Sequence, residues 1–183
     1  MCCAVWMPDA IGNVYQAKHW QDVWNSPTAQ SVRESILDGS YRWCNKLSCP
    51  VIQNADLTPF VQVTEPRFQK AIAQHETVLD FAPATVNLSY DKSCNLACPS
   101  CRTKVIMTND AERRPIDEMT DRVVLPLLAD CELVTITGSG DPFASRTFRR
   151  LLQRLGEMDY PKLQYHLLTN GQLLTPEVWE QFP

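Results

Sequence analysis

Leu133–Pro142 (LVTITGSGDP) joins a short apolar segment to a glycine-rich turn. The segment 133–136 is typical of a short buried strand, and 137–142 is typical of a turn. Ser145 follows as a favourable N-cap for a helix that ends at Gly156. Four apolar residues of that helix recur at helical spacing: Phe148, Leu151, Leu152 and Leu155. The stretch therefore predicts a strand–turn–helix unit of the kind from which parallel sheets are built.

A similar unit precedes this stretch. Thr85–Tyr90 alternates apolar and polar residues, which predicts a strand. A long loop follows, and the apolar spacing then predicts a helix over 116–128. Asp117 and Glu118 would lie in its first turn, where the helix dipole favours negative charge.

A third unit follows. Leu163–Leu168 is a predicted strand, Thr169–Gly171 a turn, and Thr175-Pro176 the start of a last helix. Strand and helix thus alternate three times, which favours right-handed βαβ units and a parallel sheet. Three strands are too few to close a barrel.

The composition is that of a globular protein: 183 residues, 44% hydrophobic and 21% charged, with a net charge of −4. This charge gives no general attraction to nucleic acid. No apolar run approaches the roughly 18–20 residues that cross a bilayer. Residues 1–6 lack the basic region and apolar core of a signal peptide. We therefore expect a cytoplasmic protein with neither nucleic acid nor membrane as partner.

The sequence divides into three regions: 1–52, rich in Trp and Cys; a connector, 53–82; and the α/β region, 83–183. The first region predicts short helices, one of which begins at Ser26-Pro27 and stops at Gly39. The connector carries one predicted helix, around 67–75.

The eight cysteines are too few for a disulfide scaffold, and clustered cysteines in a reduced compartment indicate metal binding. Cys94, Cys98 and Cys101 lie in the loop after the first predicted strand. Thiolates bind iron strongly, and three of them leave one iron of a 4Fe–4S cluster open to an outside ligand. Zinc prefers four closed ligands, usually from paired C-x-x-C units, and only Cys98 and Cys101 form such a pair.

Two more polar turns follow predicted strands, at 138–142 and at 169–171. The carboxyl ends of parallel strands meet at one edge of a sheet, and barrel enzymes build their active sites there. We therefore expect both turns to lie beside the cysteine loop.

Ser93–Arg102 (SCNLACPSCR) resembles the signature loop of the radical S-adenosylmethionine (SAM) enzymes. The resemblance implies that 83–183 is the N-terminal portion, about half, of a partial (β/α)6 barrel. It also implies that Cys94, Cys98 and Cys101 hold a 4Fe–4S cluster whose open iron binds SAM. SAM would be cleaved to methionine and a 5′-deoxyadenosyl radical, which abstracts hydrogen from a substrate.

The two polar turns resemble further elements of that family. Gly138, Ser139, Gly140 and Asp141 are similar to its Gly-Gly-Glu-Pro element, with Ser139 and Asp141 in place of Gly and Glu. This implies that Asp141 holds the amino group of SAM. Thr169 and Asn170 correspond to polar residues near the SAM ribose or carboxylate. Both turns are also common as plain turns.

Residues 2–52 resemble a SPASM-type auxiliary iron–sulfur domain, although such domains usually follow the barrel. The resemblance implies that Cys44 and Cys49, with Cys2 or Cys3 or both, bind a second 4Fe–4S cluster. A zinc knuckle or free thiols are the alternatives. Proteins with this pairing often modify peptides, so a peptide is the expected substrate, with flavodoxin or ferredoxin as electron donor.

Two other interpretations stay open. One is an iron–sulfur electron-transfer or zinc-binding module without SAM chemistry, in which a residue such as Cys131 supplies the fourth ligand. The other is an inactive fragment whose metal sites need further segments. Cys131 itself directly precedes a predicted strand, and we expect it to be a buried core thiol.

Overall fold

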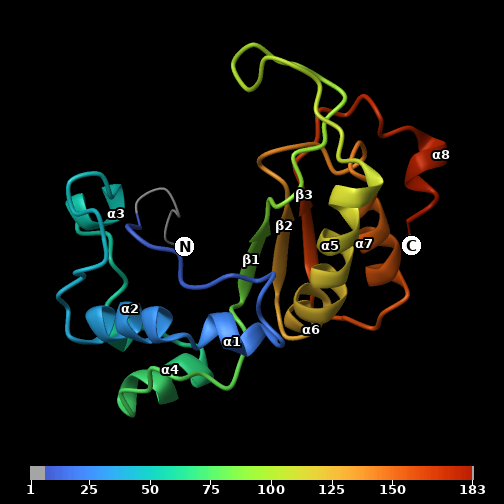
Figure 1. Ribbon diagram of the computed structural model, residues 1–183. Helices are drawn as coiled ribbons and strands as arrows, with labels where there is room; N and C mark the ends of the chain where they lie inside the picture. Colours follow the sequence, from blue (N-terminus) through green and yellow to red (C-terminus); the bar gives the residue numbers. More distant parts are fainter. Residues whose placement is uncertain (1–6, 183) are drawn as a thin grey trace. The chain divides into compact units, whose positions relative to one another are not determined.

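A computed structural model describes residues 7–182 and divides the chain into two compact units, with the boundary between Phe81 and Ala82 (Figure 1). The predicted connector thus falls almost entirely within the first unit. Of the helices in residues 7–182, none has the length and apolar character needed to cross a bilayer.

The first unit consists of short helices. They are α1 (Trp20–Trp24), α2 (Pro27–Leu37), α3 (Pro50–Gln53), the 3₁₀ helix η2 (Phe60–Gln62) and α4 (Pro66–Ala73). The predicted start of α2 is confirmed, because Ser26 Oγ accepts the Ala29 N–H at 3.1 Å and Pro27 occupies the first turn. Gly39 follows the helix with φ +72°, a conformation that glycine adopts without strain.

Arg33 bonds to both the α1–α2 junction and the last residues of this unit, 77–81. Its guanidinium lies 4.3 Å from the centre of the Trp24 ring and donates to the carbonyl oxygens of Trp24 and Thr77, at 2.6 and 2.7 Å. Burial lowers the pKa of Arg33 to about 10, so the group remains a cation at neutral pH. The Trp24 indole N–H donates to the Phe81 carbonyl at 2.9 Å. These contacts explain why 77–81 belongs to the first unit.

The second unit contains a parallel sheet of three strands, in the order β1 (Thr85–Leu88), β2 (Leu133–Ile136) and β3 (Gln164–Leu167). Leu88 pairs with Ile136, and Ile136 with Leu167, so the three carboxyl ends are level. The three predicted strands and their parallel pairing are thus confirmed.

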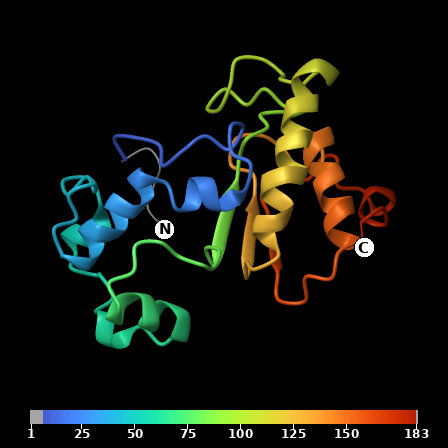
Figure 2. The ribbon, with the colours of Figure 1, turned by 60° about the horizontal axis from the view of Figure 1, so that its bottom comes forward.

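The helices of this unit are α5 (Asp110–Met119), the π-helix η3 (Thr120–Val124), α6 (Leu125–Leu128), α7 (Arg146–Gly156) and α8 (Pro176–Trp179). Figures 1 and 2 show α5, α6 and α7 on one face of the sheet. Among the described residues, the largest fully buried apolar side chains all belong to this unit: Met119, Val123, Leu128, Val134, Ile136, Phe143, Phe148, Leu151 and Leu155.

The helix predicted over 116–128 begins six residues earlier, at Asp110. Asn109 Oδ1 accepts the N–H groups of Ala111 and Glu112, both at 3.0 Å, and the Glu112 carboxylate accepts the Asn109 N–H. This capping box satisfies the free N–H groups of the first turn. The prediction that Asp117 and Glu118 form the first turn is therefore wrong, because the apolar spacing begins six residues into the helix.

Candidate functional site

The cysteine loop follows β1 and is closed at its base by paired backbone. The Cys94 N–H donates to the Ile106 carbonyl at 2.8 Å, and the Thr108 N–H donates to Ser93 Oγ at 3.0 Å. Within the loop, the Cys98 carbonyl accepts the N–H groups of Cys101 and Arg102. Cys94 is 8% exposed, whereas Cys98 and Cys101 are exposed. Hydrogen bonds thus fix the base of the loop, while the thiols of Cys98 and Cys101 are exposed.

Asp91 lies at the centre of this base and is 1% exposed. One carboxylate oxygen accepts from the Ser93 N–H at 2.9 Å and from Thr108 Oγ1 at 2.7 Å. The other accepts from Ser145 Oγ at 2.6 Å. Burial alone would raise the pKa of Asp91, but the hydrogen bonds from Ser145, Thr108 and Ser93 outweigh it and hold this pKa below its usual value. The carboxylate therefore joins both ends of the cysteine loop to the N-cap of α7.

The turn after β2 begins at a strained residue. Thr137 has φ +66° and is fully buried, which is unusual for a β-branched side chain. Its Oγ1 accepts the N–H groups of Ser139 and Gly140, at 3.0 and 2.9 Å. The N–H groups of Ser139 and Gly140 are thus used within the chain.

Gly140 packs against the backbone that leads into the cysteine loop. A Cβ at this position would lie 2.6 Å from the Ser93 carbonyl oxygen and 2.8 Å from that of Asp91. The next residue, Asp141, donates its N–H to the Ser93 oxygen at 2.8 Å. By contrast, a Cβ on Gly138 would meet nothing within 4 Å. The turn therefore packs tightly against the loop backbone at Gly140, whereas space remains beside Gly138.

Asp141 connects the turns after β2 and β3 and is itself 1% exposed. One of its carboxylate oxygens accepts the N–H groups of Phe143 and Ala144. The other accepts from Thr169 Oγ1 at 2.7 Å and from the Asn170 N–H at 2.8 Å. Four donors of the chain thus occupy the carboxylate to which the family resemblance gave the amino group of a ligand. Asp141 and Thr169 lie behind the site and position it.

Two side chains extend from this scaffold to the thiols. Asn170 places Nδ2 3.7 Å from Cys94 Sγ, and Arg102 places Nη2 3.7 Å from Cys101 Sγ. Arg102 also donates to the carbonyl oxygens of Lys92 and Ser139, at 2.6 and 2.5 Å. The guanidinium therefore connects the cysteine loop to the turn after β2.

These parts enclose a pocket of about 170 Å³. It is lined by Cys94, Leu96, Cys98, Cys101, Arg102, Gly138, Ser139, Gly140 and Asn170. The three predicted thiols and four of the six predicted cofactor-binding residues thus meet in one place. The sequence analysis did not predict a role in the site for Asp91 or Thr137. Asp91 could have been recognised, because it is a carboxylate that directly follows a predicted strand, at the edge of the sheet where active sites form.

The side chains of this pocket suit one kind of metal group and not another. Within residues 7–182, no group of three or more Cys, His, Asp or Glu side chains is arranged to hold a metal ion. A 4Fe–4S cluster makes a different demand, because each thiolate binds its own iron and the sulfurs surround the cluster. Three thiols around one pocket, with a cation and no carboxylate in its lining, fit such a cluster chemically.

Cys131 lies away from this pocket. It precedes β2, at the edge of the sheet opposite Gly138, and is 2% exposed, with its thiol 3.2 Å from the Leu127 carbonyl oxygen. The expectation of a buried core thiol is confirmed. The alternative in which Cys131 supplies a fourth ligand to the triad is wrong for this fold.

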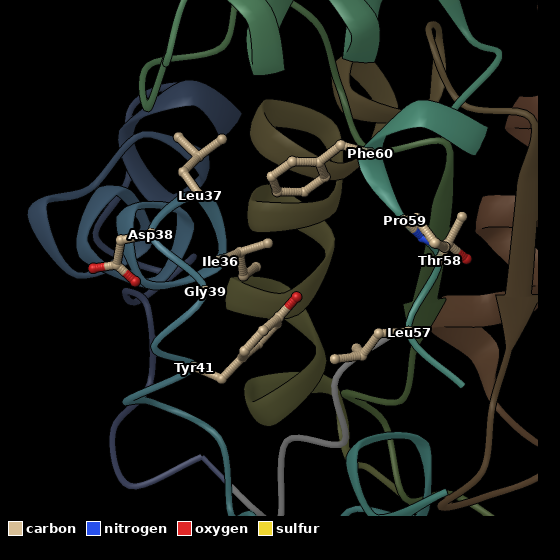
Figure 3. Close-up of a pocket in the computed structure, with 9 residues that line it drawn as sticks. All are labelled: Ile36, Leu37, Asp38, Gly39, Tyr41, Leu57, Thr58, Pro59 and Phe60. Carbon is tan, nitrogen blue, oxygen red and sulfur yellow. The ribbon is translucent and has the colours of Figure 1, made fainter. Parts of the chain in front are cut away.

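The first unit has a pocket of its own, of about 290 Å³, shown in Figure 3. It is lined by Ile36, Leu37, Asp38, Gly39, Tyr41, Leu57, Thr58, Pro59 and Phe60, and the Tyr41 hydroxyl points toward the middle of these side chains. Cys44 and Cys49 are half-buried and lie outside this lining. Cys2 and Cys3 lie outside the described residues.

Comparisons with protein-family models, with curated proteins and with solved structures found no match to this chain.

Proposed function

We propose that the second unit is about half of a radical SAM barrel and that Cys94, Cys98 and Cys101 hold a 4Fe–4S cluster that binds SAM. One observation carries this proposal: a single pocket collects the three thiols together with the turns that follow β2 and β3. Three chain segments far apart in the sequence supply its walls, as an active site at the carboxyl edge of a parallel sheet requires.

The cluster, when bound, would supply the electron that cleaves SAM and so begins hydrogen abstraction from a substrate. The chain itself would orient SAM. Because Thr137 accepts the N–H groups of Ser139 and Gly140, this turn has no free N–H there for an anion. The carbonyl oxygens of Gly138 and Gly140 accept no hydrogen bond from the described residues and stay available to a cation. We therefore assign the ammonium group of SAM to these carbonyls instead of the Asp141 carboxylate.

The proposal extends to the first unit and to the partners. Cys44 and Cys49, with Cys2 or Cys3 or both, would bind an auxiliary 4Fe–4S cluster. The substrate would be a peptide, and the electron would come from a flavodoxin or a ferredoxin. Because the proposed sites need reduced thiols, we place the protein in the cytoplasm.

A test of this function measures 5′-deoxyadenosine. The full chain is reconstituted anaerobically with iron and sulfide, then incubated with SAM and dithionite. We expect the product from the wild type and from Cys131→Ala, and none from Cys98→Ala, whose thiol lines the pocket. Equal product from Cys98→Ala and the wild type, or no product from the wild type, would contradict the proposal.

An iron–sulfur electron-transfer module is a second candidate, and the size of the pocket favours it. At about 170 Å³ the pocket is smaller than the roughly 300–1,000 Å³ of sites that enclose a whole small molecule. It suits a compact group, whereas a ligand as long as SAM would extend beyond it. A cluster that assembles and is reduced without forming 5′-deoxyadenosine would support this second function.

A further inference from the structure

We infer that Asn170 and Arg102 are positioning residues that set the reduction potential of the group held by the cysteine loop. The inference rests on the proposed cluster but not on SAM chemistry. Its basis is an asymmetry: Cys94 Sγ has the Asn170 amide at 3.7 Å and Cys101 Sγ has the Arg102 guanidinium at 3.7 Å. In the described part of the chain, Cys98 Sγ receives no such donor.

The surrounding hydrogen bonds fix which end of the Asn170 amide faces sulfur. Its Oδ1 accepts the Gln172 N–H at 3.0 Å, so this end must be the oxygen. Its Nδ2 also donates to Asn95 Oδ1 at 3.0 Å, which only the nitrogen can do. The Asn170 backbone N–H is held by Asp141. The N–H group toward Cys94 is therefore preorganised by three other contacts.

Arg102 is held in a comparable way. Nη1 donates to Lys92 in the cysteine loop, and Nη2 donates to Ser139 in the turn after β2. Because both partners are backbone carbonyls, no carboxylate neutralises the guanidinium through these bonds. Its positive charge remains next to Cys101.

N–H donors and positive charge near thiolate ligands stabilise the more negative, reduced form of a cluster and so raise its potential. Asn170 would exert this effect at Cys94, and Arg102 would exert it at Cys101. Removal of either donor should lower the potential. The two effects should be additive, because the donors contact different sulfurs and have no hydrogen bond to each other.

The experiment is a redox titration, monitored by EPR, of the reconstituted full chain without SAM. The variants are Asn170→Leu and Arg102→Gln. Asn170→Asp is a second change at the same site, which keeps the oxygen that accepts the Gln172 N–H but replaces the donor by a carboxylate. Gln172→Ala is the matched control, since it removes only the Asn95–Gln172 side-chain contact, at 3.1 Å, and touches no sulfur.

We expect a more negative midpoint potential in all three variants at unchanged iron content, and the wild-type value in Gln172→Ala. Wild-type potentials in Asn170→Leu, Asn170→Asp and Arg102→Gln would overturn the inference. So would a wild-type chain that takes up no iron and sulfide, which would also end the cluster proposal. Shifted potentials together with indifference to SAM would sustain this inference while the proposed SAM function fails.

Discussion

Replacement of Gly140 by alanine tests the junction between the cysteine loop and the turn after β2. The added Cβ would lie 2.6 Å from one backbone oxygen and 2.8 Å from another, those of Ser93 and Asp91. Neither oxygen can retreat easily, because the Asp91 carboxylate binds the Ser93 N–H and hydroxyl. Overpacking of this kind costs about 1–3 kcal/mol. Strain on the hydrogen bond from the Asp141 N–H adds about 1 kcal/mol. We predict a loss of about 2–4 kcal/mol in the free energy of unfolding.

The assay is urea unfolding of the full chain, followed by far-ultraviolet circular dichroism. Gly138→Ala is the matched control, because its Cβ would meet nothing within 4 Å. It should leave stability unchanged or raise it by up to about 1 kcal/mol, since alanine restricts the unfolded chain. Equal stability of the Gly138→Ala and Gly140→Ala proteins would refute the reasoning.

Two further predictions concern buried groups of the same unit. Asp91→Asn should cost about 1.5–3 kcal/mol at neutral pH, because it weakens hydrogen bonds to a charged acceptor. The folded-state pKa of Asp91 is lowered, so its stabilisation is complete above the unfolded value of about 4 and is lost as pH falls through the folded value. Urea unfolding at neutral and acid pH should therefore show the cost of Asp91→Asn shrinking in acid, and a constant cost would contradict this. Cys131→Ala should lower stability while iron uptake after reconstitution stays at the wild-type level, and a loss of iron would show that Cys131 is a ligand.

Local signals in the sequence were sufficient for much of the second unit. β2 was predicted at its observed bounds, and α7 was predicted from its Ser145 cap and its end at Gly156. These elements are set by short-range features: a short apolar run for β2, and an N-cap and apolar spacing for α7. The start of α5 was missed because its cap at Asn109 lies outside the apolar pattern that guided the prediction.

The role of Asp141 could not be predicted from local sequence. Its carboxylate is occupied partly by Thr169 and Asn170, 28 and 29 residues further along the chain. Only the parallel pairing of β2 with β3 brings these groups together. The same holds for Asp91, whose bond to Ser145 spans 54 residues. The sequence thus indicated which residues form the pocket, whereas tertiary structure decides which of them face a ligand and which hold the others in place.

The central claim is that a cluster on Cys94, Cys98 and Cys101 keeps one iron open for SAM. EPR of the anaerobically reconstituted and reduced protein, recorded with and without SAM, tests it most directly. We predict a 4Fe–4S signal whose g values change when SAM is added, in the wild type and in Cys131→Ala alike. A signal identical with and without SAM, or a protein that binds only zinc, would contradict the claim.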